Sequence, residues 1–250
     1  MAGHSKWANI KHRKQAVDAK RGKIFTRLAK EITVSAKLGG GDENSNPRLR
    51  AAILKARDNN VPKDNIERAI KKGTGELDSD NYEELVYEGY APGGIAIMIE
   101  VLTDKKTRTV PEIKSILSKA GGSMAESGAV SYLFEHKGII LIKGNITEEE
   151  LLEQVVESGA EDFEKDDENI YVVKTSKEEF NNVLNAFYKI AEAKGWEVLE
   201  SELQYVPTSQ IALDKSKGSA VLKLIENLEN QDDVQNVFSN LELTDEMLSE

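Results

Sequence analysis

The side chains that could do chemistry in this sequence are cations, and they are concentrated near the N-terminus. Residues 1–75 hold 18 Lys and Arg but only 7 Asp and Glu, although the whole chain carries a net charge of −11. Lysine and arginine neutralise phosphates, so a basic segment on an acidic chain indicates a surface that binds nucleic acid. The alternative is a small basic domain that docks on the acidic remainder of the chain.

The predicted binding residues are mostly Lys and Arg side chains. They are Lys6, Trp7, Lys11, His12, Arg13, Lys14, Lys20, Arg21, Lys23, Arg27, Lys30, Arg48, Arg50 and Lys55. Only Trp7 and Phe25 are aromatic in residues 1–75, whereas proteins that bind single strands typically offer several stacking platforms. This scarcity favours contacts to phosphate and to the shape of the nucleic acid. Trp7 could stack on a base, although a single Trp near a terminus is more often a docking anchor.

Most of this basic segment is predicted to be helical. Apolar residues recur at helical spacing on one side and cations fall on the other: Ile24, Phe25, Leu28 and Ile32 against Lys23, Arg27, Lys30 and Lys37. Such a helix can pack and present cations at once. Gly39 to Gly41 mark its end, and further helices are expected from Pro47 and from Pro62, with Gly73 closing the last one.

The segment from Gly3 to Arg21 has a different pattern. Its cations are distributed around any helical wheel, so no clean apolar face is left. This pattern is typical of an arm that becomes ordered on a polyanion. A solvated, charged helix without a partner is the alternative.

The rest of the chain alternates between predicted strands and helices. Residues 138–206 follow the order strand, helix, strand, strand, helix, strand, which is the ferredoxin-like unit. We therefore predict an α+β multidomain protein, with an N-terminal basic helical domain followed by two ferredoxin-like α/β domains. The predicted boundaries are 1–78 for the helical domain, 79–135 plus 207–240 for the first α/β domain, and 136–206 for the second, inserted into the first. A simple tandem arrangement is the alternative.

Several local expectations accompany this assignment. Residues 129–135 and 138–142 are predicted to be separate strands. A helix is expected from Ser176 to Lys194, with Glu179 completing a capping box. The glycine-rich stretch 121–128 is expected to be a plain connection from helix to strand, with an anion-binding loop as the alternative.

The composition argues against an enzyme. The chain has no cysteine and three histidines, two of which lie in the basic arm. There is no phosphate-binding loop motif, no histidine metal pair and no serine triad partner, so no cofactor or metal is expected. No apolar run approaches the ~20 residues that a membrane helix needs, and the N-terminus does not resemble a secretory signal. We therefore expect a cytoplasmic protein without a membrane partner.

Long motifs then make a family resemblance visible. Residues 2–14 are AGHSKWANIKHRK, and they are followed by RGKIF at 21–25, NPRLR at 46–50, PKDNIERAI at 62–70 and YEGYAPGG at 87–94. With the GGS loop at 121–123, these motifs strongly resemble the YebC/PmpR family over essentially the whole chain.

The resemblance implies three domains and a cytoplasmic, non-enzymatic role. Members are described as DNA-binding transcriptional regulators. Relatives include a mitochondrial translational activator of cytochrome c oxidase subunit I, and bacterial members linked to ribosomes stalled at proline-rich sequence. We predict a nucleic-acid-binding regulator of gene expression, with transcription regulation at promoter DNA first. The alternative is a ribosome-associated, RNA-binding translation factor that binds structured ribosomal RNA and relieves stalled translation. The α/β domains are the candidate surface for a homodimer.

Overall fold

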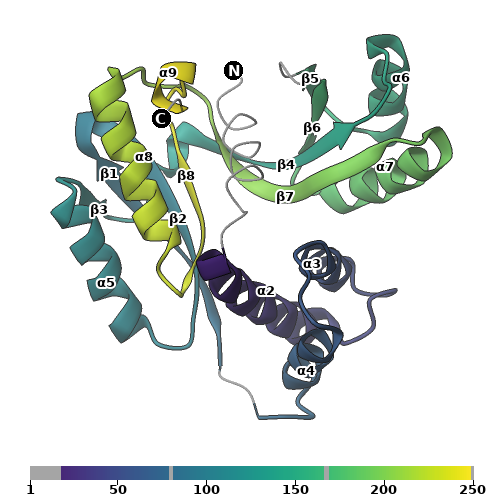
Figure 1. Ribbon diagram of the computed structural model, residues 1–250, viewed down its shortest axis with the longest axis horizontal. Coiled ribbons are helices and arrows are strands. Elements are labelled where there is room, and N and C mark those ends of the chain that lie inside the picture. The colour runs from purple at the N-terminus through teal and green to yellow at the C-terminus, as the bar shows by residue number, and fades with distance from the viewer. Residues whose placement is uncertain (1–17, 79–80, 166–168, 249–250) are drawn as a thin grey trace. The chain divides into compact units, whose positions relative to one another are not determined.

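The fold is given by a computed structural model that describes residues 18–78, 81–165 and 169–248 (Figure 1). The chain divides into two compact units. The central unit comprises residues 133–209. The flanking unit comprises the described residues on both sides of it, up to residue 132 and from residue 210.

The flanking unit begins with helices packed around a shared apolar core. They are α2 (Asp18–Gly39), α3 (Pro47–Asp58) and α4 (Lys63–Thr74). Ile32 of α2, Leu49 and Ile53 of α3 and Ile66 of α4 are buried in one cluster, as the helical spacing predicts. Asn46 joins two of these helices, because its side chain caps the Leu49 N–H and its amide donates to the carbonyl of Ser35 at 2.8 Å.

The end of α4 differs from the prediction that Gly73 closes it. The helix continues to Thr74, and Gly75 ends it in the left-handed region at φ +84°. Gly73 lies inside the helix because α4 approaches α2 closely there. A Cβ atom at Gly73 would lie 2.3 Å from the carbonyl oxygen of Thr33 and 2.7 Å from the Cβ of Ala36.

This contact predicts opposite effects of the same substitution at two helical glycines. Gly73→Ala should lower the free energy of unfolding by about 1–3 kcal/mol, since the added methyl must separate two backbones, and this outweighs a propensity gain of about 1 kcal/mol. Gly22→Ala in α2 meets nothing within 4 Å and should instead raise it by about 0.5–1 kcal/mol. Urea unfolding of both variants measures the difference, and stabilisation by Gly73→Ala would contradict the close packing.

The flanking unit also contains an antiparallel sheet in the order β3-β1-β2-β8. Its elements are β1 (Glu83–Ala91), β2 (Ile95–Thr103), α5 (Lys106–Lys119), β3 (Ser123–Ala125), α8 (Lys215–Glu229) and β8 (Val234–Ser239), with short helical turns at Pro92–Gly94 and Ser131–Leu133 and a last helix, α9 (Asp245–Leu248). Its central strand β2 is almost wholly buried, as its continuous apolar sequence predicts. Residues 120–122 connect α5 to β3, which confirms the expected plain connection.

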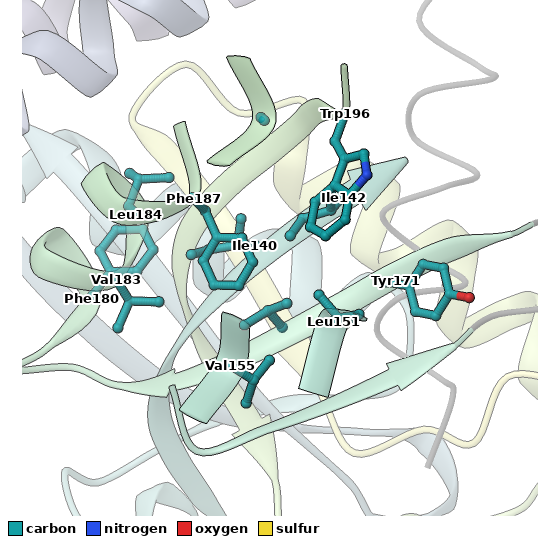
Figure 2. Packing of buried hydrophobic residues seen from close by; sticks show 12 residues of the cluster. Ile140, Ile142, Leu151, Val155, Tyr171, Phe180, Val183, Leu184, Phe187 and Trp196 are labelled. Atoms are coloured by element: carbon teal, nitrogen blue, oxygen red, sulfur yellow. The ribbon is translucent and has the colours of Figure 1, made fainter. Parts of the chain in front are cut away.

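The central unit forms the second antiparallel sheet, in the order β5-β6-β4-β7. Its elements are β4 (Phe134–Lys143), α6 (Glu148–Ser158), β5 (Asp162–Lys165), β6 (Ile170–Ser176), α7 (Phe180–Lys194) and β7 (Glu197–Pro207). This chain order and strand order are those of a ferredoxin-like fold. The predicted fold class is therefore confirmed. Figure 2 shows the core of this unit, in which Leu151 and Phe187 from the helices meet Ile140 of the sheet.

Two local predictions in this region were wrong. Residues 129–135 do not form a separate strand, and β4 runs without a break from Phe134 to Lys143. The carboxylate of Glu88 explains the first point, because it accepts the backbone N–H groups of Gly128, Val130 and Ser131 at 2.6–3.0 Å and so occupies donors that a strand would need. These bonds outweigh burial, which alone would raise the pKa of Glu88, and lower it.

The second wrong prediction concerns the start of α7. Ser176 is still paired with Lys137 in the sheet, so the helix begins only at Phe180. The Ser176 hydroxyl does accept the Glu179 N–H, at 3.2 Å, but in the turn that precedes the helix. A true capping box lies at α6, where Thr147 and Glu150 bond each other's backbone N–H groups.

Candidate nucleic-acid interface

The predicted binding residues fall into groups that differ in their surroundings. Lys6, Trp7, Lys11, His12, Arg13 and Lys14 lie outside the described residues. Lys20 and Arg21 belong to the first turns of α2. The other six have described side chains: Lys23, Arg27 and Lys30 on α2, and Arg48, Arg50 and Lys55 on α3.

The three cations of α2 contact the segment around β8 within the flanking unit. Lys23 donates to the carbonyl of Asn230, and the guanidinium of Arg27 donates to the carbonyl of Gln235 at 3.1 Å. Lys30 donates to the carbonyl of Asp232 at 2.9 Å. Burial lowers the pKa of Arg27, against the effect of nearby Glu229. These hydrogen bonds favour the alternative that the basic helix docks on an acidic neighbour.

Asp233 is the centre of this contact. Its side chain is only 1% exposed, and Oδ1 accepts the ammonium of Lys30 at 2.8 Å while Arg108 donates to both carboxylate oxygens. Thr103 and Thr109 donate their hydroxyls to Oδ2 at 3.1 and 2.7 Å. Burial alone would raise the pKa of Asp233, but the hydrogen bonds from Lys30, Arg108 and Thr109 outweigh it and hold the pKa well below its usual range.

The cations of α3 are also engaged within the flanking unit. Arg48 forms a two-pronged ion pair with Glu31 and contacts Glu84. Burial opposes the charge of Arg48, but these two carboxylates raise its pKa. Arg50 donates to the carbonyls of Glu43 and Asn44 at 2.9 and 2.7 Å, and therefore holds the loop before α3. Lys55 is half-buried.

A second set of cations, absent from the prediction, is more exposed. Arg57 ends α3, and Lys63, Arg68 and Lys71 lie on α4, all with exposed side chains. Arg57 and Lys63 have loose pairs, with N···O distances of 3.5 Å to Glu43 and Glu67, between side chains that are at least 40% exposed. Exposed pairs of this kind contribute about 0–1 kcal/mol, so they leave both cations available to phosphate. We call these four residues the α3–α4 basic surface.

The sequence did contain a signal for this surface. Its members lie off the apolar positions of their helices, which is the criterion that selected Arg48, Arg50 and Lys55. The criterion separates inward from outward positions, but it does not show which outward cations have a neighbour from another part of the chain.

Other chemistry finds little support in the described part of the chain. No group of three His, Asp or Glu among these residues could hold a metal ion. Within the same residues, no helix has the length and apolar character needed to cross a membrane. The buried carboxylates Glu88 and Asp233 are saturated by hydrogen bonds from the protein itself.

A basic helical bundle joined to two ferredoxin-like folds is the architecture of a multidomain binding protein. The chain belongs to the TACO1/YebC family: residues 5–76 match the description "TACO1/YebC protein N-terminal domain" and residues 82–241 match "TACO1/YebC second and third domain". This confirms the resemblance that the motifs suggested.

Individual relatives match over nearly their whole length. A "Probable transcriptional regulatory protein" of Leptospira biflexa is 57% identical over 97% of each chain. Another of the same description, from Treponema pallidum, is 50% identical over 99% of this chain and all of its own. A crystal structure of a conserved hypothetical protein from Aquifex aeolicus has a TM-score of 0.86 and 44% identity, covering 98% of this chain and all of that one. The relatives' names describe regulators of gene expression and not enzymes, in agreement with the prediction.

Proposed function

We propose that this protein is a DNA-binding transcriptional regulator that holds nucleic acid through the α3–α4 basic surface and the N-terminal arm. The observation that carries the proposal is the exposure of Arg57, Lys63, Arg68 and Lys71, in contrast to the intramolecular bonds of Lys23, Arg27 and Lys30. Relatives over the full length are named probable transcriptional regulatory proteins, which supports the same reading.

Charge outside this region supports a single orientation on the nucleic acid. Residues 76–250 hold 15 Lys and Arg against 37 Asp and Glu. Phosphate therefore repels most of the chain and attracts only its basic end, which restricts how the protein approaches a duplex.

The geometry of α3 and α4 favours duplex DNA as the target. Only residues 59–62 separate the two helices, a length typical of helix-turn-helix connections. The first two turns of α4 present Lys63, Asn65 and Arg68 on its exposed side. In a helix-turn-helix protein the second helix enters the major groove with its N-terminal residues foremost.

A second candidate function is a ribosome-associated translation factor that binds structured RNA. The observation that favours it is the lack of base-stacking side chains: Phe25 is the sole aromatic residue in the described part of the helical region up to residue 75, and it packs on the apolar core. Recognition would then rest on phosphate and shape, as in the recognition of RNA helices.

The α3–α4 basic surface can be tested directly. Replacing Arg57, Lys63, Arg68 and Lys71 together with Ala should weaken binding to a DNA duplex by about 10-fold or more at low salt and flatten the dependence of affinity on salt, because fewer counterions are released. Fluorescence anisotropy at several salt concentrations measures both quantities.

The matched control removes the same charge from the acidic part of the chain. Lys114, Lys119, Lys189 and Lys223 are exposed there, and their joint replacement by Ala should leave affinity and salt slope nearly unchanged. Equal losses in the two variants would mean that net charge alone matters and would contradict the assigned surface.

Crosslinking in cells, followed by sequencing of both DNA and RNA, separates the two candidate functions. The proposal expects enrichment of promoter DNA that the α3–α4 variant loses. Enrichment of ribosomal RNA without promoter DNA would overturn the transcriptional function in favour of the translational one.

A further inference from the structure

The sheet of the central unit is buried on both faces, although its helices cover only one. Ile140 and Val173 point toward α6 and α7 and are completely buried with Phe187. Their sequence neighbours point to the other face, where Leu141 is 1% and Val172 3% exposed. We call this second side the open face of the sheet.

The open face has an apolar centre. Ile139, Leu141, Ile170 and Val172 form a separate buried cluster, with Leu199 and Val206 packed at its margin. Antiparallel sheets commonly leave one face to solvent, and then the strands alternate between apolar and polar residues. Here β4 instead has an unbroken apolar run from Ile139 to Ile142, which is typical of a strand buried on both sides.

Carboxylates border this centre. In the pairing of β4 with β7, Glu200 stands opposite Leu141 and Glu202 opposite Ile139, so both share the open face. In the pairing of β5 with β6, Glu164 stands opposite Val172, and it is paired with Lys174 of the same face. A segment that fits this face therefore needs apolar side chains for the centre and cations for the border.

We propose that the N-terminal arm of the same chain, residues 1–17, docks on the open face. The arm contains Lys6, Lys11, Arg13 and Lys14 and no Asp or Glu, which complements the acidic border. Trp7 and Ile10 supply the large apolar side chains that the centre requires. The seventeen residues would measure about 26 Å as a helix, which matches a strand of about eight residues.

Zero-length crosslinking with a carbodiimide tests the docking in the full chain without nucleic acid. The reagent joins a lysine amine to a carboxylate only when the two are in contact. The proposal expects amide crosslinks from Lys6, Lys11 or Lys14 to Glu200 or Glu202 within monomeric protein. Their loss in the Glu200→Gln, Glu202→Gln double variant, with the Lys137–Glu161 crosslink retained as an internal control, is part of the expectation.

Two crosslinking results would overturn the proposal. Arm lysines joined only to residues of the flanking unit would place the arm elsewhere. Crosslinks to Glu200 and Glu202 that occur only in a dimer would mean that a second copy supplies the arm.

Fluorescence of Trp7 gives an independent readout that needs no crosslink. The chain has two tryptophans, so Trp196→Phe leaves Trp7 as the sole emitter. Docking predicts emission that is shifted to the blue and protected from acrylamide, and both properties should be lost in Glu200→Gln, Glu202→Gln. Emission like that of free tryptophan in a folded protein would contradict the docking.

One consequence rests on the proposed function. The arm cations that would pair with Glu200 and Glu202 are also predicted phosphate contacts, so docking and nucleic-acid binding should compete. The Glu200→Gln, Glu202→Gln variant should then bind a duplex several-fold more tightly. Crosslinks with unchanged affinity would refute the competition alone, whereas absent crosslinks would refute the docking and leave the α3–α4 surface standing.

Discussion

Replacing Asp233 with Asn is expected to lower the free energy of unfolding by about 3 kcal/mol. The substitution keeps the shape of the side chain but removes the charge that compensates Lys30, whose own side chain is only 11% exposed. Breaking a buried ion pair by removing one partner costs about 3–5 kcal/mol, and the partial exposure of Arg108, at 42%, places the loss at the lower end.

The adjacent residue provides a matched control. Asp232 is exposed, and it meets Lys30 through its backbone carbonyl, so Asp232→Asn should change the stability by less than about 0.5 kcal/mol. Urea unfolding of the full chain measures both variants. A loss at position 233 no larger than that at position 232 would mean that the carboxylate does not hold α2 to the β8 segment.

The pH dependence gives the same prediction a second test. Because the pKa of Asp233 is lower in the folded state than the value of about 4 in an unfolded chain, the charge stabilises the fold fully above pH 4. This contribution is lost as the pH falls from about 4 toward the folded pKa. The difference in stability between the original chain and Asp233→Asn should therefore be constant from neutral pH down to about 5 and shrink below 4.

A double-mutant cycle tests whether Lys30 and Asp233 act together. Lys30→Met removes the ammonium but keeps an apolar stem of similar length. If the two residues form one contact, the double variant should lose less stability than the sum of the single losses. Strict additivity would show that Arg108 and the threonines, and not Lys30, account for the importance of Asp233.

The secondary structure was largely predictable because it depends on local periodicity. The stripe through Leu28 and Ile32 defined α2, and the order of elements from 138 to 206 defined the ferredoxin-like unit. Errors arose where a distant group replaced a local rule. Glu88 takes the backbone donors of residues 128–131, some 40 positions away, and this prevents the strand that the local sequence favoured.

The candidate interface was less predictable for the same reason. Helical spacing shows correctly that Lys30 lies away from the apolar core of its helix bundle, but its partner Asp233 is 203 residues away. Asp232 and Asp233 are also indistinguishable by residue type, although one is exposed and the other buried. Which cations remain open to phosphate therefore depends on tertiary contacts that no helical pattern contains.

Adjacent leucines on α6 should differ in their response to the same substitution. Leu151 is fully buried against the sheet, as Figure 2 shows, whereas Leu152 is 53% exposed. Leu151→Ala should lower the free energy of unfolding of the central unit by about 2–5 kcal/mol, since it removes apolar contacts and leaves a cavity. Leu152→Ala should change it by no more than about 0.5 kcal/mol.

The contrast depends on the orientation of α6, which its first turn sets. The capping box of Thr147 and Glu150 fixes where the helix begins, and Leu151 and Val155 then face the core one turn apart. Trp196 belongs to the same cluster, so its fluorescence in a Trp7→Phe background reports the unfolding of this unit. Equal losses for the two leucine variants would mean that α6 is rotated about its axis, with a different side packed on the sheet.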